Sequence, residues 1–133
     1  MRYVKVETSS ARNLSRNKLI PSEEIRIGTA LLETIDETLE MLGAKVKHFV
    51  YHHLDKKFGL QRDEIPSKVE IFSKGLMSLF GSISKQIELL ILKKLCQRLM
   101  VDGDFIHDGG LSEGIRRLKE HLLQINADLI LEK

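Results

Sequence analysis

The apolar residues of this chain recur three and four positions apart, which is the spacing of one face of an α-helix. Leu32, Ile35, Leu39 and Leu42 show this spacing first. Four later stretches repeat it, while the alternation typical of strands is almost absent. We therefore expect five helices, over about 22–42, 44–58, 67–80, 83–100 and 111–131.

Glycines and capping residues mark several ends of these helices. Ser22 is a suitable N-cap for the first helix, and Gly43 and Gly59 stand where the first and second helices are expected to end. Ser67 and Glu70 fit a capping box, in which the two residues satisfy each other's orphan backbone donors. The third helix is accordingly expected to begin at Ser67.

The stretch 83–100 differs from the others because its apolar residues cover most of the helix circumference. They are Ile83, Ile87, Leu89, Leu90, Ile91, Leu92, Leu95, Cys96 and Leu99. A helix that is apolar nearly all round is buried nearly all round. We expect an all-α fold, a compact bundle of about five helices around this central apolar helix, with residues 21–133 forming a single domain.

Residues 1–20 lack a helical period and are predicted to form a flexible N-terminal arm. Its charged residues are the cations Arg2, Lys5, Arg12, Arg16 and Lys18 and the single acid Glu7. The whole chain carries a net charge of +2, so residues 21–133 are faintly acidic. The basic character is therefore concentrated in the arm.

Composition narrows the class of protein. The single cysteine, Cys96, excludes an internal disulfide and is expected to be a reduced, buried thiol. No apolar signal sequence is visible, and the longest purely apolar run, Leu89 to Leu92, is far shorter than the roughly 20 residues of a membrane span. We expect a cytoplasmic protein. Because no phosphate-binding glycine loop, dinucleotide fingerprint or nucleophile elbow occurs, we expect no cofactor and no enzyme activity.

The last predicted helix carries a regular apolar seam. Its members are Leu111, Ile115, Leu118, Leu122, Ile125 and Leu129, spaced four and three residues apart. Such spacing can pair with a second helix in a homodimer or with a partner protein. Leu123 and Ile130 widen the stripe, which favours packing inside the bundle instead. The sequence leaves both alternatives open.

Three histidines in the second predicted helix are candidates for chemistry. His48 and His52 lie four residues apart and share a face, but two ligands do not make a metal site. His53 points into the apolar stripe and is expected to be a core histidine with a hydrogen-bond partner. We predict no metal, and the sequence leaves open whether these histidines have any functional role.

The loop from Asp102 to Asp108 partly resembles a calcium-binding loop. Asp102, Asp104 and Glu113 stand at positions 1, 3 and 12 of such a loop. Ile106 and His107 occupy positions 5 and 6, so a ligand and the required glycine are missing. We interpret the segment as an ordinary turn-rich loop.

A second group of cations lies in the helices, and it supports an alternative function. Its members are Lys93, Lys94, Arg98, Arg116, Arg117 and Lys119. Clustered lysine and arginine residues neutralise phosphates, so the basic arm together with these residues suggests a nucleic-acid-binding regulator. We hold this as the alternative, because the body of the chain is not basic overall.

Helix stops and core positions between residues 35 and 95 follow a recognisable order. They are Ile35-Asp36-Glu37, Leu42-Gly43, Val50-Tyr51, Leu54, Lys57-Phe58-Gly59, Glu64-Ile65-Pro66, Phe72, Leu76, Phe80-Gly81, Ile87-Glu88, Ile91 and Leu95. This stretch resembles an archaeal family of small helical domains of unknown function, found alone or as output-like modules of signalling proteins. The resemblance implies an archaeal cytoplasmic protein in a signalling or regulatory setting, and it supplies no catalytic residues.

Our leading hypothesis from the sequence is a non-enzymatic interaction module. It would act through an apolar helix surface, as a homodimer or with a partner protein. The seam of residues 111–131 is the candidate surface. No membrane partner is expected.

Overall fold

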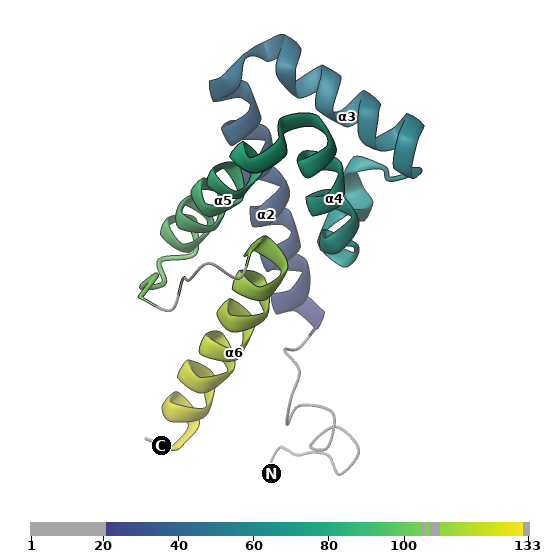
Figure 1. The fold of residues 1–133 in the computed structure, drawn as a ribbon. Helices are drawn as coiled ribbons and strands as arrows, with labels where there is room; N and C mark the ends of the chain where they lie inside the picture. The colour runs from purple at the N-terminus through teal and green to yellow at the C-terminus, as the bar shows by residue number, and fades with distance from the viewer. Residues whose placement is uncertain (1–20, 105, 107–109, 132–133) are drawn as a thin grey trace.

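The structure is a computed structural model that describes residues 21–104, 106 and 110–131, with side chains described as far as residue 125 (Figure 1). Within these residues the chain forms helices and no strand, which confirms the all-α prediction. The elements are α2 (Pro21–Leu42), α3 (Ala44–Phe58), η1 (Arg62–Ser67), α4 (Val69–Phe80), η2 (Gly81–Ile83), α5 (Ser84–Arg98) and α6 (Gly110–Leu131), where η1 and η2 are 3₁₀-helices. The predicted arm, residues 1–20, lies outside the described residues.

One hydrophobic core joins these helices. The helix α5 packs against α2, α4 and α6, and its residues Ile91, Leu92 and Leu95 are fully buried. The expectation of a central apolar helix is therefore confirmed, although α5 is not buried all round. Leu89 and Leu90 are only half-buried, because the side of α5 that carries them is not fully covered by neighbouring helices.

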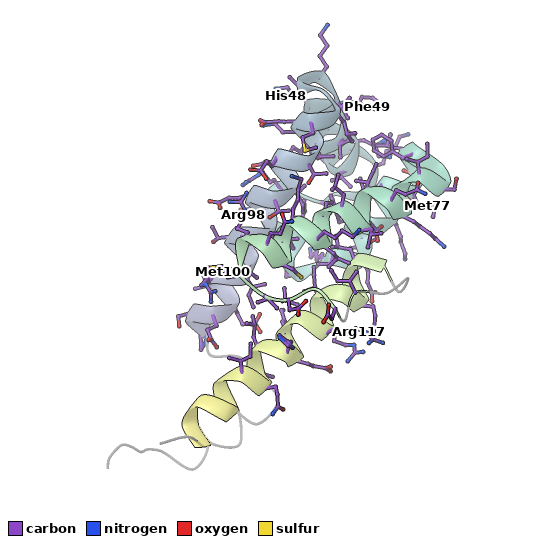
Figure 2. All side chains as sticks on the ribbon, turned by 90° about the vertical axis from the view of Figure 1, so that its left-hand side faces the viewer. His48, Phe49, Met77, Arg98, Met100 and Arg117 are labelled. Carbon is purple, nitrogen blue, oxygen red and sulfur yellow. The ribbon has the colours of Figure 1, made fainter. Side chains whose placement is uncertain are left out.

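The helix α6 reaches beyond the other helices. Its first half packs against α4 and α5, whereas its second half extends past the start of α2 in both views (Figures 1 and 2). An ion pair of 2.9 Å between Lys119 Nζ and Glu24 Oε1 joins the middle of α6 to the first turn of α2. The part of α6 that follows Lys119 is called the projecting half below.

The beginning of α4 differs from the prediction. The expected capping box of Ser67 and Glu70 does not form, because Lys68 is the N-cap residue and the Ser67 hydroxyl donates to the Glu64 carbonyl oxygen at 3.0 Å. The capping box lies earlier, at the start of η1, where Gln61 and Glu64 satisfy each other's backbone donors. The predicted start of α4 at Ser67 is therefore two residues early, because Ser67 is the last residue of η1 and α4 begins at Val69.

Residues Val69–Arg98 are long and apolar enough, by length and composition alone, to cross a membrane. In the structure η2 divides this stretch into α4 and α5, which pack against each other. One such stretch is weak support for a membrane protein, because the core helices of soluble proteins have the same composition.

A polar cluster joins α2, α3 and η1. The Tyr51 hydroxyl donates a hydrogen bond of 2.5 Å to Asp36 Oδ1, and Arg62 donates through Nε and Nη2 to the two Asp36 carboxylate oxygens at 3.2 and 2.6 Å. Partial burial acts to raise the pKa of Asp36, but the hydrogen bonds from Arg62 and Tyr51 outweigh it and hold the pKa below its ordinary value. Burial and the Asp36 carboxylate raise the pKa of Tyr51, so its hydroxyl stays protonated and remains a donor.

Replacing Asp36 with asparagine is expected to lower the free energy of unfolding by about 1–2 kcal/mol at pH 7, since hydrogen bonds to a charged group are lost. The folded-state pKa of Asp36 lies below the unfolded value of about 3.9. The stabilisation is therefore present above that value and is lost as the pH falls through the folded-state pKa. Urea denaturation between pH 7 and pH 2 should show the difference between wild type and Asp36→Asn shrinking in acid.

The matched control for this change is Asp63→Asn, which removes an exposed carboxylate from the neighbouring η1. It should leave the free energy of unfolding nearly unchanged at every pH. Equal effects of the two substitutions would contradict a specific role for the cluster around Asp36.

Candidate functional site

The apolar seam of α6 divides into a buried part and an accessible part. Leu111, Ile115 and Leu118 are buried in the core of this chain. For these three residues the predicted partner interface is wrong, because α4 and α5 already cover the first half of α6. Internal packing, the alternative that the sequence left open, describes this half of the helix.

The seam continues into the projecting half of α6. Leu122 is half-buried, whereas Ile125 is 39% exposed. Leu129 follows at the next seam position, but its side chain lies outside the described part of the structure. From Leu118 into the projecting half, as far as Ile125, α6 therefore carries an apolar stripe that this chain covers less and less.

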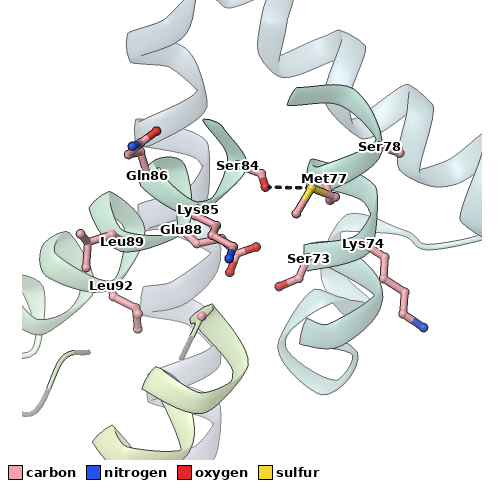
Figure 3. A pocket seen from close by; sticks show the side chains of 11 residues that line it. Ser73, Lys74, Met77, Ser78, Ser84, Lys85, Gln86, Glu88, Leu89 and Leu92 are labelled. Carbon is pink, nitrogen blue, oxygen red and sulfur yellow. Dashed lines mark hydrogen bonds between the residues drawn. The ribbon is translucent and has the colours of Figure 1, made fainter. Parts of the chain in front are cut away.

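A cleft of about 770 Å³ lies between α4 and α5, with the first residue of α6 at one side (Figure 3). Its apolar surface comes from Met77, Leu89 and Leu92, and its polar surface comes from both helices. The Ser84 hydroxyl donates to Met77 Sδ at 3.7 Å, which holds Met77 beside the cleft. This volume lies within the range of pockets that hold small molecules.

The buried carboxylate of Glu88 is part of this cleft. Glu88 is only 7% exposed, and its Oε1 accepts a hydrogen bond of 2.8 Å from the Leu111 backbone N–H. The carboxylate therefore caps the N-terminus of α6, where the helix dipole favours negative charge. Sequence reasoning missed Glu88, although an acidic residue inside the apolar run Ile87–Leu92 was a visible signal.

The histidines of α3 do not come together in a metal site. His48 and His52 are exposed, and the part of the chain that the structure describes contains no group of three or more metal-ligating side chains. His53 Nε2 lies 2.7 Å from the Ser78 Oγ, and its ring stands between Phe49 and Phe58. The expected hydrogen-bond partner is confirmed, at the junction of α3 and α4, but the expected core position is wrong, because His53 is only half-buried.

The aspartate-rich loop forms a local turn in its described part. The Asp104 backbone N–H donates to Asp102 Oδ1 at 3.2 Å, which is the hydrogen bond of an Asx turn. Residues 105 and 107–109, which include further positions of the calcium-like pattern, lie outside the described residues. The Asp102 carboxylate thus accepts a hydrogen bond from the loop itself.

Most of the helical cations that motivated the nucleic-acid alternative form ion pairs with carboxylates. Arg98 bridges Glu33 and Glu37 across α2 and α5. Hydrogen bonds from Arg116 and Arg117 lower the pKa of Glu113 to about 2. These pairs reduce the positive charge available to phosphates on the described helices. The arm residues of that alternative, Arg2, Lys5, Arg12, Arg16 and Lys18, lie outside the described residues.

Other large apolar side chains are also exposed, and they include Ile25, Met41, Leu42 and Ile83. Phe49 is 58% exposed and Met100 is 92% exposed, and Figure 2 shows them, with Met77, at separate points of the surface. Single exposed apolar residues are normal on globular proteins. The projecting half of α6 and the cleft between α4 and α5 are therefore the two candidate sites.

No protein-family model, curated protein or solved structure matches this chain. Any proposal for its function therefore rests on the two candidate sites of the chain itself. Of the two candidate sites, sequence reasoning anticipated α6 and not the cleft.

Proposed function

We propose that this protein is a non-enzymatic interaction module that forms a homodimer through the projecting half of α6. The single observation that carries the proposal is the continuation of the α6 seam past the body, from the buried Leu118 to Leu122 and the exposed Ile125. The proposed setting is cytoplasmic and regulatory, as the resemblance of residues 35–95 to archaeal signalling-associated domains implies.

A second copy of this chain is the partner proposed for this surface, because the surface can pair with itself. Two identical stripes related by a twofold axis bury each other, so no different partner surface is required. Among the described side chains of the projecting half, Glu120 is the only lysine, arginine or acidic residue, so no large charge of one sign opposes association. The 4-3 spacing of Leu118, Leu122 and Ile125 matches helix pairing along one seam.

The test is the solution mass, measured by light scattering over a concentration series. We expect a dimer that dissociates on dilution. Ile125→Lys places a charge in the seam and should raise the dimer dissociation constant by about tenfold or more, which corresponds to roughly 1.4 kcal/mol. Gln124→Lys adds the same charge at a neighbouring exposed position on another face of the helix, and it should leave the constant nearly unchanged.

Two results would contradict the proposal. One is a monomer at every concentration up to the millimolar range. The other is a dimer that Ile125→Lys and Gln124→Lys weaken equally, because its interface would then lie elsewhere. Circular dichroism of both variants ensures that a loss of dimer is not a loss of folding.

A further inference from the structure

The cleft between α4 and α5 contains a buried charge whose compensation is incomplete. Glu88 is 7% exposed, and among the ion pairs of the described residues none includes it. Buried glutamates are almost always paired with a cation. The N-terminus of α6 supplies only about half a positive charge, through the Leu111 N–H that bonds to Oε1. The carboxylate can therefore accept a further cationic donor.

A second polar group of the cleft, unlike Glu88, has no hydrogen-bond partner at all among the described residues. The Ser73 hydroxyl oxygen is buried and has no hydrogen-bond partner within the described structure. Figure 3 shows the Ser73 hydroxyl and the Glu88 carboxylate on opposite walls, both directed into the space between α4 and α5. An unpartnered buried hydroxyl is costly, and a ligand that offers a hydrogen bond removes that cost.

The rest of the lining restricts the chemistry of an occupant. Met77, Leu89 and Leu92 provide an apolar wall, which favours a hydrophobic body. Lys74 and Lys85 also line the cleft and are exposed; in Figure 3 Lys74 points away from the space between α4 and α5. The two lysines would repel a second positive charge on the ligand. The end of the ligand that lies near them should therefore be neutral or acidic.

We propose that this cleft is a binding site for a small apolar amine. Its ammonium group contacts the Glu88 carboxylate and the Ser73 hydroxyl, its apolar body lies against Met77, Leu89 and Leu92, and its other end is neutral or acidic. The site is separate from the projecting half of α6, so the inference does not depend on dimer formation.

Three probes share a phenyl ring and differ in their charged groups, so they test which charge the cleft binds. Phenethylamine carries only the amine, phenylalanine carries the amine and a carboxylate, and 3-phenylpropionate carries only the carboxylate. Titration calorimetry at pH 7 with the full chain should show saturable binding of phenethylamine and phenylalanine, and no binding of 3-phenylpropionate. Amide chemical shifts should change around the cleft.

Glu88→Gln removes the charge while its amide oxygen can still accept the Leu111 N–H bond, so α6 keeps its cap. We expect this variant to bind both amines about tenfold more weakly or worse, because a charge-assisted hydrogen bond is lost. Glu70→Gln is the control, since it removes an exposed carboxylate of α4 that does not line the cleft. Equal binding by Glu88→Gln and wild type, binding of 3-phenylpropionate as tight as that of phenethylamine, or no saturable binding of either amine would overturn the proposal.

Discussion

Replacing Phe72 with alanine is expected to lower the free energy of unfolding by about 3–5 kcal/mol. Phe72 is the largest of the fully buried side chains, and it lies on α4, which packs against α3, α5 and α6. Its removal leaves a cavity that the surrounding helices fill only in part. Because a domain of this size is stable by only about 5–15 kcal/mol, the variant should unfold at a much lower urea concentration.

Phe49→Ala is the matched control, since the same atoms are removed from an exposed position on α3. It should change the free energy of unfolding by less than about 1 kcal/mol. Both variants are compared with wild type by urea denaturation, followed by circular dichroism at 222 nm. A loss of similar size in the two variants would contradict the assignment of Phe72 to the core.

Substitution of Gly114 by valine is expected to destabilise the protein by about 2–3 kcal/mol through overpacking. A Cβ atom at this position would lie 2.4 and 2.6 Å from the two terminal methyl carbons of Leu92 and 3.0 Å from its Cγ. Leu92 is itself buried, so its side chain has little room to move. The glycine therefore sets how closely α6 approaches α5.

A double-mutant cycle tests this explanation directly. Leu92→Ala alone should cost about 2–5 kcal/mol, because it opens a cavity in the core. The double variant with Gly114→Val should lose less free energy of unfolding than the sum of the two single variants. The reason is that the smaller alanine side chain at position 92 leaves room for the valine. Strict additivity, measured by urea denaturation of all four proteins, would show that the two residues do not contact each other.

Helix ends were predictable where one residue type alone decides them. The bounds of α3 agree with the prediction because Gly43 and Gly59 flank it, and both have positive φ angles that disfavour other residues. The start of α4 was not predictable in the same way. The sequence fits a capping box at Ser67 and Glu70, but in the structure Pro66 and Ser67 end η1, and Lys68 is the N-cap of α4.

The candidate sites depend on tertiary packing more strongly than the helix ends do. Spacing identified the α6 seam from Leu111 to Leu129, but a periodic stripe does not state where a neighbouring helix stops covering it. The cleft was not predicted at all, since Ser73 and Glu88 come to line one cleft only when α4 packs against α5. Its one visible trace in the sequence was an acidic residue among leucines and isoleucines.

The hydrogen bond from the Leu111 N–H to Glu88 has a consequence for how this protein tolerates changes of length. The first turn of α6 is held by a side chain of α5, and Gly114 fits against Leu92 of the same helix. The position of α6 is thus specified by its packing against α4 and α5 as well as by the connection to α5. Residues added beside the exposed Asp102 or Asp104 should therefore leave α6 in place, because the closure entropy of a loop grows slowly with its length. An insertion at this point is therefore expected to cost little of the free energy of unfolding, whereas one beside the buried Leu99 should cost more.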